Sequence, residues 1–227
     1  MNRLARATVA VLPLLTLGLV VPEAAEAQFH RYAAGFTAGG SHVTVLNPDA
    51  PGNALALEPG AGAMFGLHAD RWYGSTGRLG LRYQAAYQQP TFDWQPGERR
   101  ISALSGDVSA MLRPIAPGAD NRVLPYLTAG AGGMWYDLGT GDSTSFNQAA
   151  AFHDGGSRLI PVVLLAAGLD VGIPWHWGSS PVWVRAEIAD HVALNSPIRK
   201  LSDRARYGAV HHYRFSVGLH SVFRHGR

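Results

Sequence analysis

The sequence predicts an all-β protein: a closed antiparallel transmembrane β-barrel of about eight strands that follows a cleaved signal peptide. Apolar and polar residues alternate with a period of two through successive segments, which is typical of strands with two different faces. These segments run for about 11–16 residues, which suits tilted membrane-spanning strands and exceeds the usual length of about 5–6 in soluble proteins. Aromatic residues gather at the segment ends, as expected where rings lie at two lipid–water boundaries.

The N-terminal stretch, residues 1–27, is predicted to be an export signal. It has a basic end, an apolar run and a small-residue cleavage site, formed by Arg3 and Arg6, by Ala7 to Val21, and by Ala25, Glu26 and Ala27. An uncleaved anchor is disfavoured because the run is shorter than the roughly 20 residues needed to span, and Pro13 and Gly18 interrupt it. The barrel is therefore expected in residues 28–227.

The composition excludes several classes of protein. The chain has no cysteine, which rules out disulfide staples, thiolate catalysis and cysteine-bound metal. The net charge of +3 comes from scattered arginines and the single lysine Lys200, with no basic run, which does not favour nucleic-acid binding. After the signal, the longest apolar stretch is Leu159 to Ile173, and Pro161 and Asp170 interrupt it, so a helical membrane protein is not expected.

Four segments predict the first half of the barrel. In Arg31–Thr44, small residues separate the apolar ones, and a turn cluster of Asn, Pro, Asp and Gly follows. Leu55–Asp70 alternates aliphatic and aromatic residues with glycine, methionine and histidine. Leu79–Trp94 is clearer, because Leu, Tyr and Ala alternate with Gly, Arg and Gln. Arg100–Arg113 alternates Leu, Val and Ala with Ser and Asp, and a turn with proline and glycine follows at 114–121.

Four further segments complete the barrel. Leu124–Leu138 alternates Leu, Ala and Trp with Thr, Gly and Met. Arg158–Ile173 alternates in its second part but is apolar on both faces where it begins. Pro181–Val192 places aliphatic residues opposite Trp, Arg and Glu, and His211–Phe223 closes the chain. An even number of strands leaves both chain ends on the periplasmic side.

The loop lengths agree with this orientation. With both ends periplasmic, the connections after the first, third, fifth and seventh strands face outward. The two longest gaps, Gly139–Ser157 and Asn195–Arg206, both belong to this outward set.

The closing strand relates the chain to a known family. One of its faces is apolar and the other is polar or small, formed by Tyr213, Phe215, Val217, Leu219 and Phe223 and by His212, Arg214, Ser216, Gly218 and His220. Such a strand with a terminal aromatic, on an exported chain, resembles the last strand of bacterial outer-membrane β-barrels, although Arg224 to Arg227 follow the aromatic here. The start of the fifth predicted strand, Pro125-Tyr126-Leu127, also resembles strand starts in small barrels of this kind.

Over essentially the whole mature chain, the pattern is similar to the small eight-stranded outer-membrane β-barrel family, which includes the transmembrane domain of outer-membrane protein A and outer-membrane protein X. The resemblance implies a location in the cell outer membrane of a Gram-negative-type bacterium. It also implies contact with outer-membrane lipids and with the barrel assembly machinery, which would read the C-terminal strand ending at Phe223.

The interior is predicted to be polar and filled. A barrel of about eight strands is just wide enough inside for side chains. The polar faces carry charges of both signs, so we expect pairing in the centre, without an open pore, between Glu58, Asp107 and Glu187 and Arg82, Arg185 and Arg214. Two aromatic belts are expected, one of Trp72, Tyr73, Tyr126, Trp175, Trp177, Trp183 and Phe223 and one of Tyr87, Phe92, Trp94, Trp135, Tyr136 and Tyr207.

A lipid-modifying enzyme is the main alternative function. Lipid A deacylases are small outer-membrane barrels that use a serine, a histidine and an acid near the chain end, which draws attention to Glu187, Asp190, His191, Asn195 and Ser196. In that family histidine and serine lie two apart and asparagine follows. Here His191 and Ser196 lie five apart and Asn195 precedes the serine, so the spacing does not place them on one face. We therefore expect no enzyme and no catalytic residues.

Metal and cofactor sites are not expected either. His211, His212, His220 and His225 suggest a metal, but His212 and His220 lie about 26 Å apart along an extended strand, and His211 points to the opposite face. Two glycine clusters suggest phosphate loops, yet they lie in strand patterns without a following helix: Gly60, Gly62 and Gly66, and Gly130, Gly132 and Gly133.

The expected function is structural or recognition by the outward loops. Asp142 and Asp154 lie on one such loop and could meet an extracellular ligand or a cation, although a solvated loop is the simpler interpretation. A soluble periplasmic ligand-binding barrel is a second alternative, because the same alternation fits apolar faces that point inward.

Overall fold

The computed structural model describes residues 31–45, 58–74, 76–94, 97–100, 102–117, 121–137, 157–194 and 210–224. The predicted signal peptide and the predicted loop residues Asp142, Asp154, Asn195 and Ser196 lie outside them. No helix in the described part of the chain is long and apolar enough to cross a membrane.

Each predicted strand is present. The strands are β1 (Arg31–Val45), β2 (Glu58–Tyr73), β3 (Leu79–Trp94), β4 (Gly97–Arg100), β5 (Ser102–Leu112), β6 (Val123–Asp137), β7 (Ser157–Trp177), β8 (Ser180–Ala193) and β9 (Val210–Arg224). Several boundaries differ from the prediction by one to four residues; β2, for example, ends at Tyr73 and not at Asp70. The predicted fourth strand corresponds to β5, and the short strand β4 begins three residues before the predicted start at Arg100. Strand β7 continues four residues beyond Ile173, with a shift of its register against β8 between Gly172 and His176.

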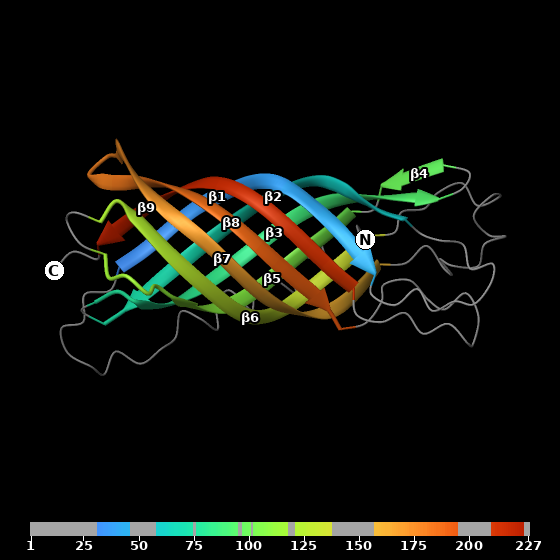
Figure 1. Ribbon diagram of the computed structural model, residues 1–227, viewed down its shortest axis with the longest axis horizontal. Coiled ribbons are helices and arrows are strands. Elements are labelled where there is room, and N and C mark those ends of the chain that lie inside the picture. Colours follow the sequence, from blue (N-terminus) through green and yellow to red (C-terminus); the bar gives the residue numbers. More distant parts are fainter. Residues whose placement is uncertain are drawn as a thin grey trace, which may run out of the picture.

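The strands close into a barrel (Figure 1). Each long strand pairs antiparallel with its neighbours in the chain, β2 pairs with β3, and β1 pairs with β9, while β4 pairs with β3 alone. Of the nine described strands, eight therefore form the ring. Closure leaves no open edge between the eight ring strands, which is what a strand-built protein needs in hydrocarbon.

The two ends of the barrel differ. At the end where β1 begins and β9 finishes, the turns include Gly74, Gly77 and Gly178, all with positive φ (70°, 58° and 63°), a conformation that glycine adopts without steric cost. At the other end, β3 and β4 continue as a hairpin beyond the barrel (Figure 1). The even number of ring strands puts the start of β1 and the end of β9 at the same end. We call this the periplasmic end and the opposite one the outward end, following the orientation expected from the sequence.

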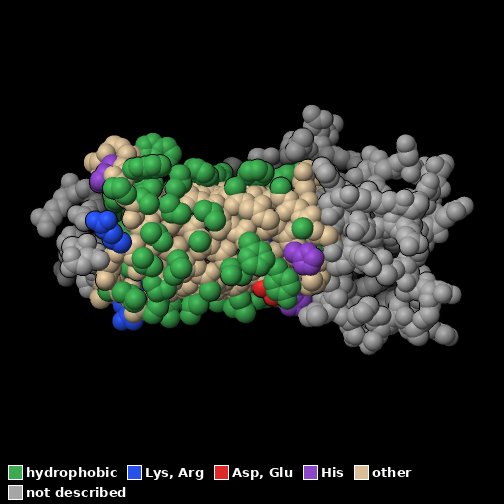
Figure 2. Space-filling view, turned by 45° about the horizontal axis from the view of Figure 1, so that its top comes forward, with side chains coloured by type: hydrophobic (Ala, Val, Ile, Leu, Met, Phe, Trp, Pro, Cys, Tyr) green, Lys and Arg blue, Asp and Glu red, His purple; other side chains and the backbone are tan. Residues whose placement is uncertain are grey.

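The outer wall is apolar and the interior is polar. Phe65 and Leu67 on β2 are 61% and 67% exposed, while His68 and Asp70, at the alternate positions of the same strand, are buried. The space-filling view shows hydrophobic side chains over the wall between the ends, with charged and histidine side chains toward the two ends (Figure 2). The soluble alternative required the apolar faces to point inward, so this arrangement contradicts it.

One part of the aromatic-belt prediction is wrong. Trp72, Tyr126 and Tyr136 are buried inside the barrel, between 0% and 1% exposed, and not on the lipid-facing wall. Trp72 lies opposite Gly80 and Tyr126 opposite Gly168, and a glycine leaves room in the narrow interior for a large ring.

Other members of the belts are at least partly exposed. At the periplasmic end these are Tyr73, Trp175, Trp177 and Phe223, and toward the outward end Tyr87 and Trp135. Trp183 is also partly exposed, but it lies opposite Gly172 and the buried His220 and therefore belongs to the inward-facing side of β8. The side chains of Phe92, Trp94 and Tyr207 lie outside the described part of the structure.

Candidate functional site

A network of buried charges fills the periplasmic half of the barrel interior. Arg82 on β3 donates from Nε to Asp70 Oδ1 (3.0 Å) and also bonds to Glu187 on β8. Arg185 on β8 donates from Nη2 to Asp70 Oδ2 (2.8 Å) and from Nε to Asp170 Oδ1 on β7 (2.7 Å). The carboxylates of three strands are thus held by two arginines, which agrees with the rule that buried charges are paired.

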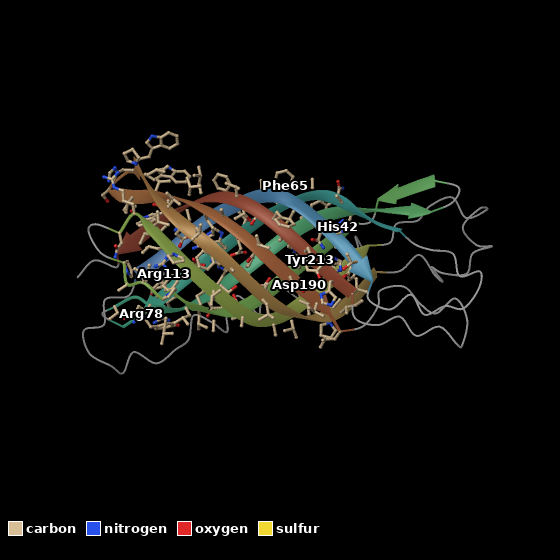
Figure 3. The ribbon with its side chains drawn as sticks, viewed as in Figure 1. His42, Phe65, Arg78, Arg113, Asp190 and Tyr213 are labelled. Atoms are coloured by element: carbon tan, nitrogen blue, oxygen red, sulfur yellow. The ribbon has the colours of Figure 1, made fainter. Side chains whose placement is uncertain are left out.

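Aromatic rings complete this charge network. The Tyr126 hydroxyl donates to Glu187 Oε2 (2.7 Å), and its ring lies 5.0 Å from the guanidinium carbon of Arg82 and 4.9 Å from that of Arg185. Arg113, which lies toward the periplasmic end of the barrel in Figure 3, donates to Asp170 Oδ2 (2.7 Å). Its guanidinium lies 3.6 Å from the ring centroid of Trp72, a cation–π geometry.

A second polar layer lies nearer the outward end and is centred on Arg214. Its guanidinium donates to Gln88 Oε1 (3.1 Å) and Ser105 Oγ (2.9 Å) and contacts His191 Nε2 (3.1 Å). His191 Nε2 also lies 3.3 Å from Asp107 Oδ2. His212 contacts Gln88 and the hydroxyl of Tyr136, so the layer is continuous across the barrel.

An apolar layer lies inside the outward end of the barrel. It is formed by buried residues of six strands, namely Val43, Ala103, Met134, Tyr136, Ile160, Val162, Ala193 and Val210. This layer explains why β7 begins with apolar residues on both faces: Ile160 and Val162 belong to it, while Leu159 and Val163 face outward. Side chains therefore occupy the interior from one end of the described barrel to the other.

Of the ion pairs predicted between interior carboxylates and arginines, one is present and others have different partners. Glu187 bonds to Arg82 as expected. Asp107 contacts His191, and Arg214 is held by neutral groups in the described residues, so the expected ion pairs of these two are not formed. The sequence prediction missed Asp70 and Asp170, although both lie on the inward-facing positions of their strands. The Glu58 side chain lies outside the described part.

Of the residues considered for lipid hydrolysis, the three that the structure describes do not point to one place. Glu187 and His191 point into the interior. Asp190 points to the outer wall, where its Oδ2 lies 2.7 Å from His211 Nδ1. The ring of His211 stacks with that of Tyr213 at 5.8 Å, and Figure 3 shows Tyr213 and Asp190 in the outward half of the barrel, close to His42.

The histidines of the closing strand lie on both faces. His212 and His220 are buried in the interior, in different layers, and His211 lies on the outer wall. The ring of His220 lies 5.8 Å from that of His68. Among the described residues, no group of three or more His, Asp or Glu side chains is arranged to hold a metal ion.

A closed barrel with an apolar wall, aromatic residues near its ends and a charged, packed interior is an integral outer-membrane β-barrel. No family model and no curated protein matches the sequence. Among solved structures, the chain is similar to the outer membrane protein OprG from Pseudomonas aeruginosa, with a TM-score of 0.50, 13% identity, and coverage of 88% of this chain and 97% of OprG.

It is also similar to Neisserial surface protein A, with a TM-score of 0.51, 13% identity, and coverage of 87% of this chain and 100% of that one. At such low identity the similarity concerns the fold. The protein is thus a small integral β-barrel of the bacterial outer membrane, surrounded by membrane lipid.

Proposed function

We propose that the protein is a non-enzymatic envelope barrel whose closed body presents its outward connections for recognition. The main support for this proposal is that the connections between strands are longer at the outward end than at the periplasmic end. At the periplasmic end β7 and β8 are joined through Gly178 and Ser179 alone. At the outward end, residues 46–57, 138–156 and 194–209 separate successive strands, and the hairpin of β3 and β4 projects beyond the wall.

The filled interior supports the same function. Because ion pairs, hydrogen bonds and an apolar layer occupy the barrel, contact with extracellular molecules is expected at the outward end and not inside. A lipid-modifying enzyme has less support, since Asp190 lies on the wall while Glu187 and His191 lie in the interior.

Loop replacement in living cells tests the proposal. Residues 138–156 are replaced by a short Gly-Ser linker, and a matched control carries a peptide tag between Gly178 and Ser179. Both variants should reach the outer membrane and migrate faster on gels before boiling. The linker variant should lose the binding of cells to an immobilised glycan and matrix-protein panel, while the control should retain it. Equal binding by both variants would argue against loop recognition.

The enzyme alternative has its own measurement. Lipid A from cells that express the barrel is compared with lipid A from cells that lack it, by mass spectrometry. We expect the same acylation in both. Loss of an acyl chain that depends on the barrel and disappears in H191A, while H191A still folds, would establish the enzyme instead.

We also propose that the barrel assembly machinery recognises β9. Two features support this: β9 is the strand that closes the ring against β1, and its Phe223 is 43% exposed on the wall beside Tyr32. An accessible aromatic at the end of the last strand is available for recognition before closure.

A further inference from the structure

Arg71 on β2 places a cation on the lipid-facing wall. Its neighbours in sequence, Asp70 and Trp72, are buried in the interior, so Arg71 points outward. In the strand register, Arg71 lies opposite Tyr32 on β1 and opposite Leu81 on β3. Among the described residues no carboxylate forms an ion pair with it, which distinguishes it from Arg82, Arg113 and Arg185 in the interior.

Two aromatic rings hold the guanidinium. Its central carbon lies 5.8 Å from the ring centroid of Tyr32 and 5.2 Å from that of Tyr73, within the range of cation–π contacts. The Arg71 Nε atom is buried and has no hydrogen-bond partner among the described residues. The rings thus fix the position of the cation, and its Nε has no partner among the described residues.

The depth of Arg71 in the wall indicates what kind of group can approach the guanidinium from outside, since the residue as a whole is only partly buried. Tyr32 also pairs with Phe223, and the exposed Trp175 and Trp177 belong to the same periplasmic end. Aromatic residues of this kind mark the boundary between hydrocarbon and headgroups, where an arginine is tolerated far better than at the midplane. Toward the membrane centre the wall continues with the exposed Phe36 and Leu67, which pair with each other.

We propose that Arg71, held between Tyr32 and Tyr73, binds the phosphate of a glycerophospholipid headgroup in the periplasmic leaflet. A guanidinium donates two parallel hydrogen bonds to phosphate oxygens, a geometry that lysine does not reproduce. The acyl chains of the same lipid would lie along Phe36 and Leu67. Free phosphate offers the same oxygens but no chains, so the apolar wall favours the lipid.

Native mass spectrometry of the detergent-purified barrel with added phosphatidylglycerol tests this site. R71Q removes the cation, Y73L removes one ring and keeps the charge, and R122Q is the control, because Arg122 is an exposed arginine near the same end. We expect R71Q to weaken binding of one lipid about fivefold, the factor that corresponds to one basic residue near an anionic surface. Y73L should weaken it less, and R122Q should bind as the wild type does.

Two results would overturn the proposal. One is equal lipid retention in the wild type, R71Q and Y73L, each checked for folding by its faster migration before boiling. The other is displacement of the lipid by millimolar inorganic phosphate, which would identify a free-anion site. The lipid site is independent of the outward loops, so its failure would leave the proposed recognition function unaffected.

Discussion

Arg185 on β8 donates a hydrogen bond to Asp70 on β2 over 2.8 Å, although β9 and β1 lie between these strands in the wall. Both side chains are essentially inaccessible to solvent, at 1% and 0% exposure. Asp70 also accepts from Arg82 on β3, so one carboxylate serves two cations from different strands. The interior therefore links parts of the wall that no backbone ladder joins directly.

Asp70→Asn should destabilise the barrel strongly. The change leaves Arg82 and Arg185 with less compensation in a buried site, and breaking such a pair costs about 3–5 kcal/mol. Urea unfolding in lipid vesicles, followed by tryptophan fluorescence, measures the loss. D190N is the control, because Asp190 is 26% exposed and bonds to His211 on the wall; its effect should be about 0–1 kcal/mol. A similar loss in both variants would contradict a special role for the interior network.

Gly168→Ala should disturb the same network from the opposite wall. A Cβ at this position would collide with the hydroxyl and ring of Tyr126, which donates to Glu187. Overpacking of a filled interior typically costs about 1–3 kcal/mol. The unfolding free energy of G168A should fall by this amount, whereas G106A should change little, because nothing lies within 4 Å of a Cβ built at Gly106. Equal stability of G168A and the wild type would show that Tyr126 has room to move.

The strand pattern could be predicted because it is local. Alternation with a period of two identifies which residues share a face, and the long segments with an export signal favour a membrane barrel over a soluble one. The structure confirms this for neighbours such as Phe65 and Met64, which lie on the wall and in the interior. In a membrane barrel the apolar face of each strand points to the lipid and the polar face points to the interior.

The interior contacts could not be predicted from local pattern. Trp72 and Tyr126 were assigned to a belt because they lie near strand ends, but each faces a glycine on the next strand, and that pairing depends on register. Asp70 is the last residue of a predicted strand and Asp170 interrupts an apolar run, so neither suggested an ion pair. Their partners come from strands far away in sequence, and only closure of the barrel brings them together.

The purified barrel should not conduct small solutes. Arg185, Arg214 and Tyr136 are among the largest fully buried side chains, and they lie at successive levels of the interior. Liposomes that contain the protein should swell in isosmotic sugar no faster than liposomes without it. A known outer-membrane porin serves as the positive control. Swelling above the protein-free rate would show that the layers open in the membrane.

Phe223→Ala should slow assembly without weakening the folded barrel. Phe223 is 43% exposed on the wall, so its removal loses few interior contacts, and surface changes usually alter stability by about 0.5 kcal/mol or less. If the assembly machinery reads the end of β9, pulse-chase labelling should show slower appearance of the fast-migrating folded form in cells. V217A is the matched control, because Val217 is an exposed wall residue in the middle of the same strand. Equal assembly rates for F223A and V217A, with equal unfolding free energies in vitro, would mean that the terminal aromatic is not the recognised feature.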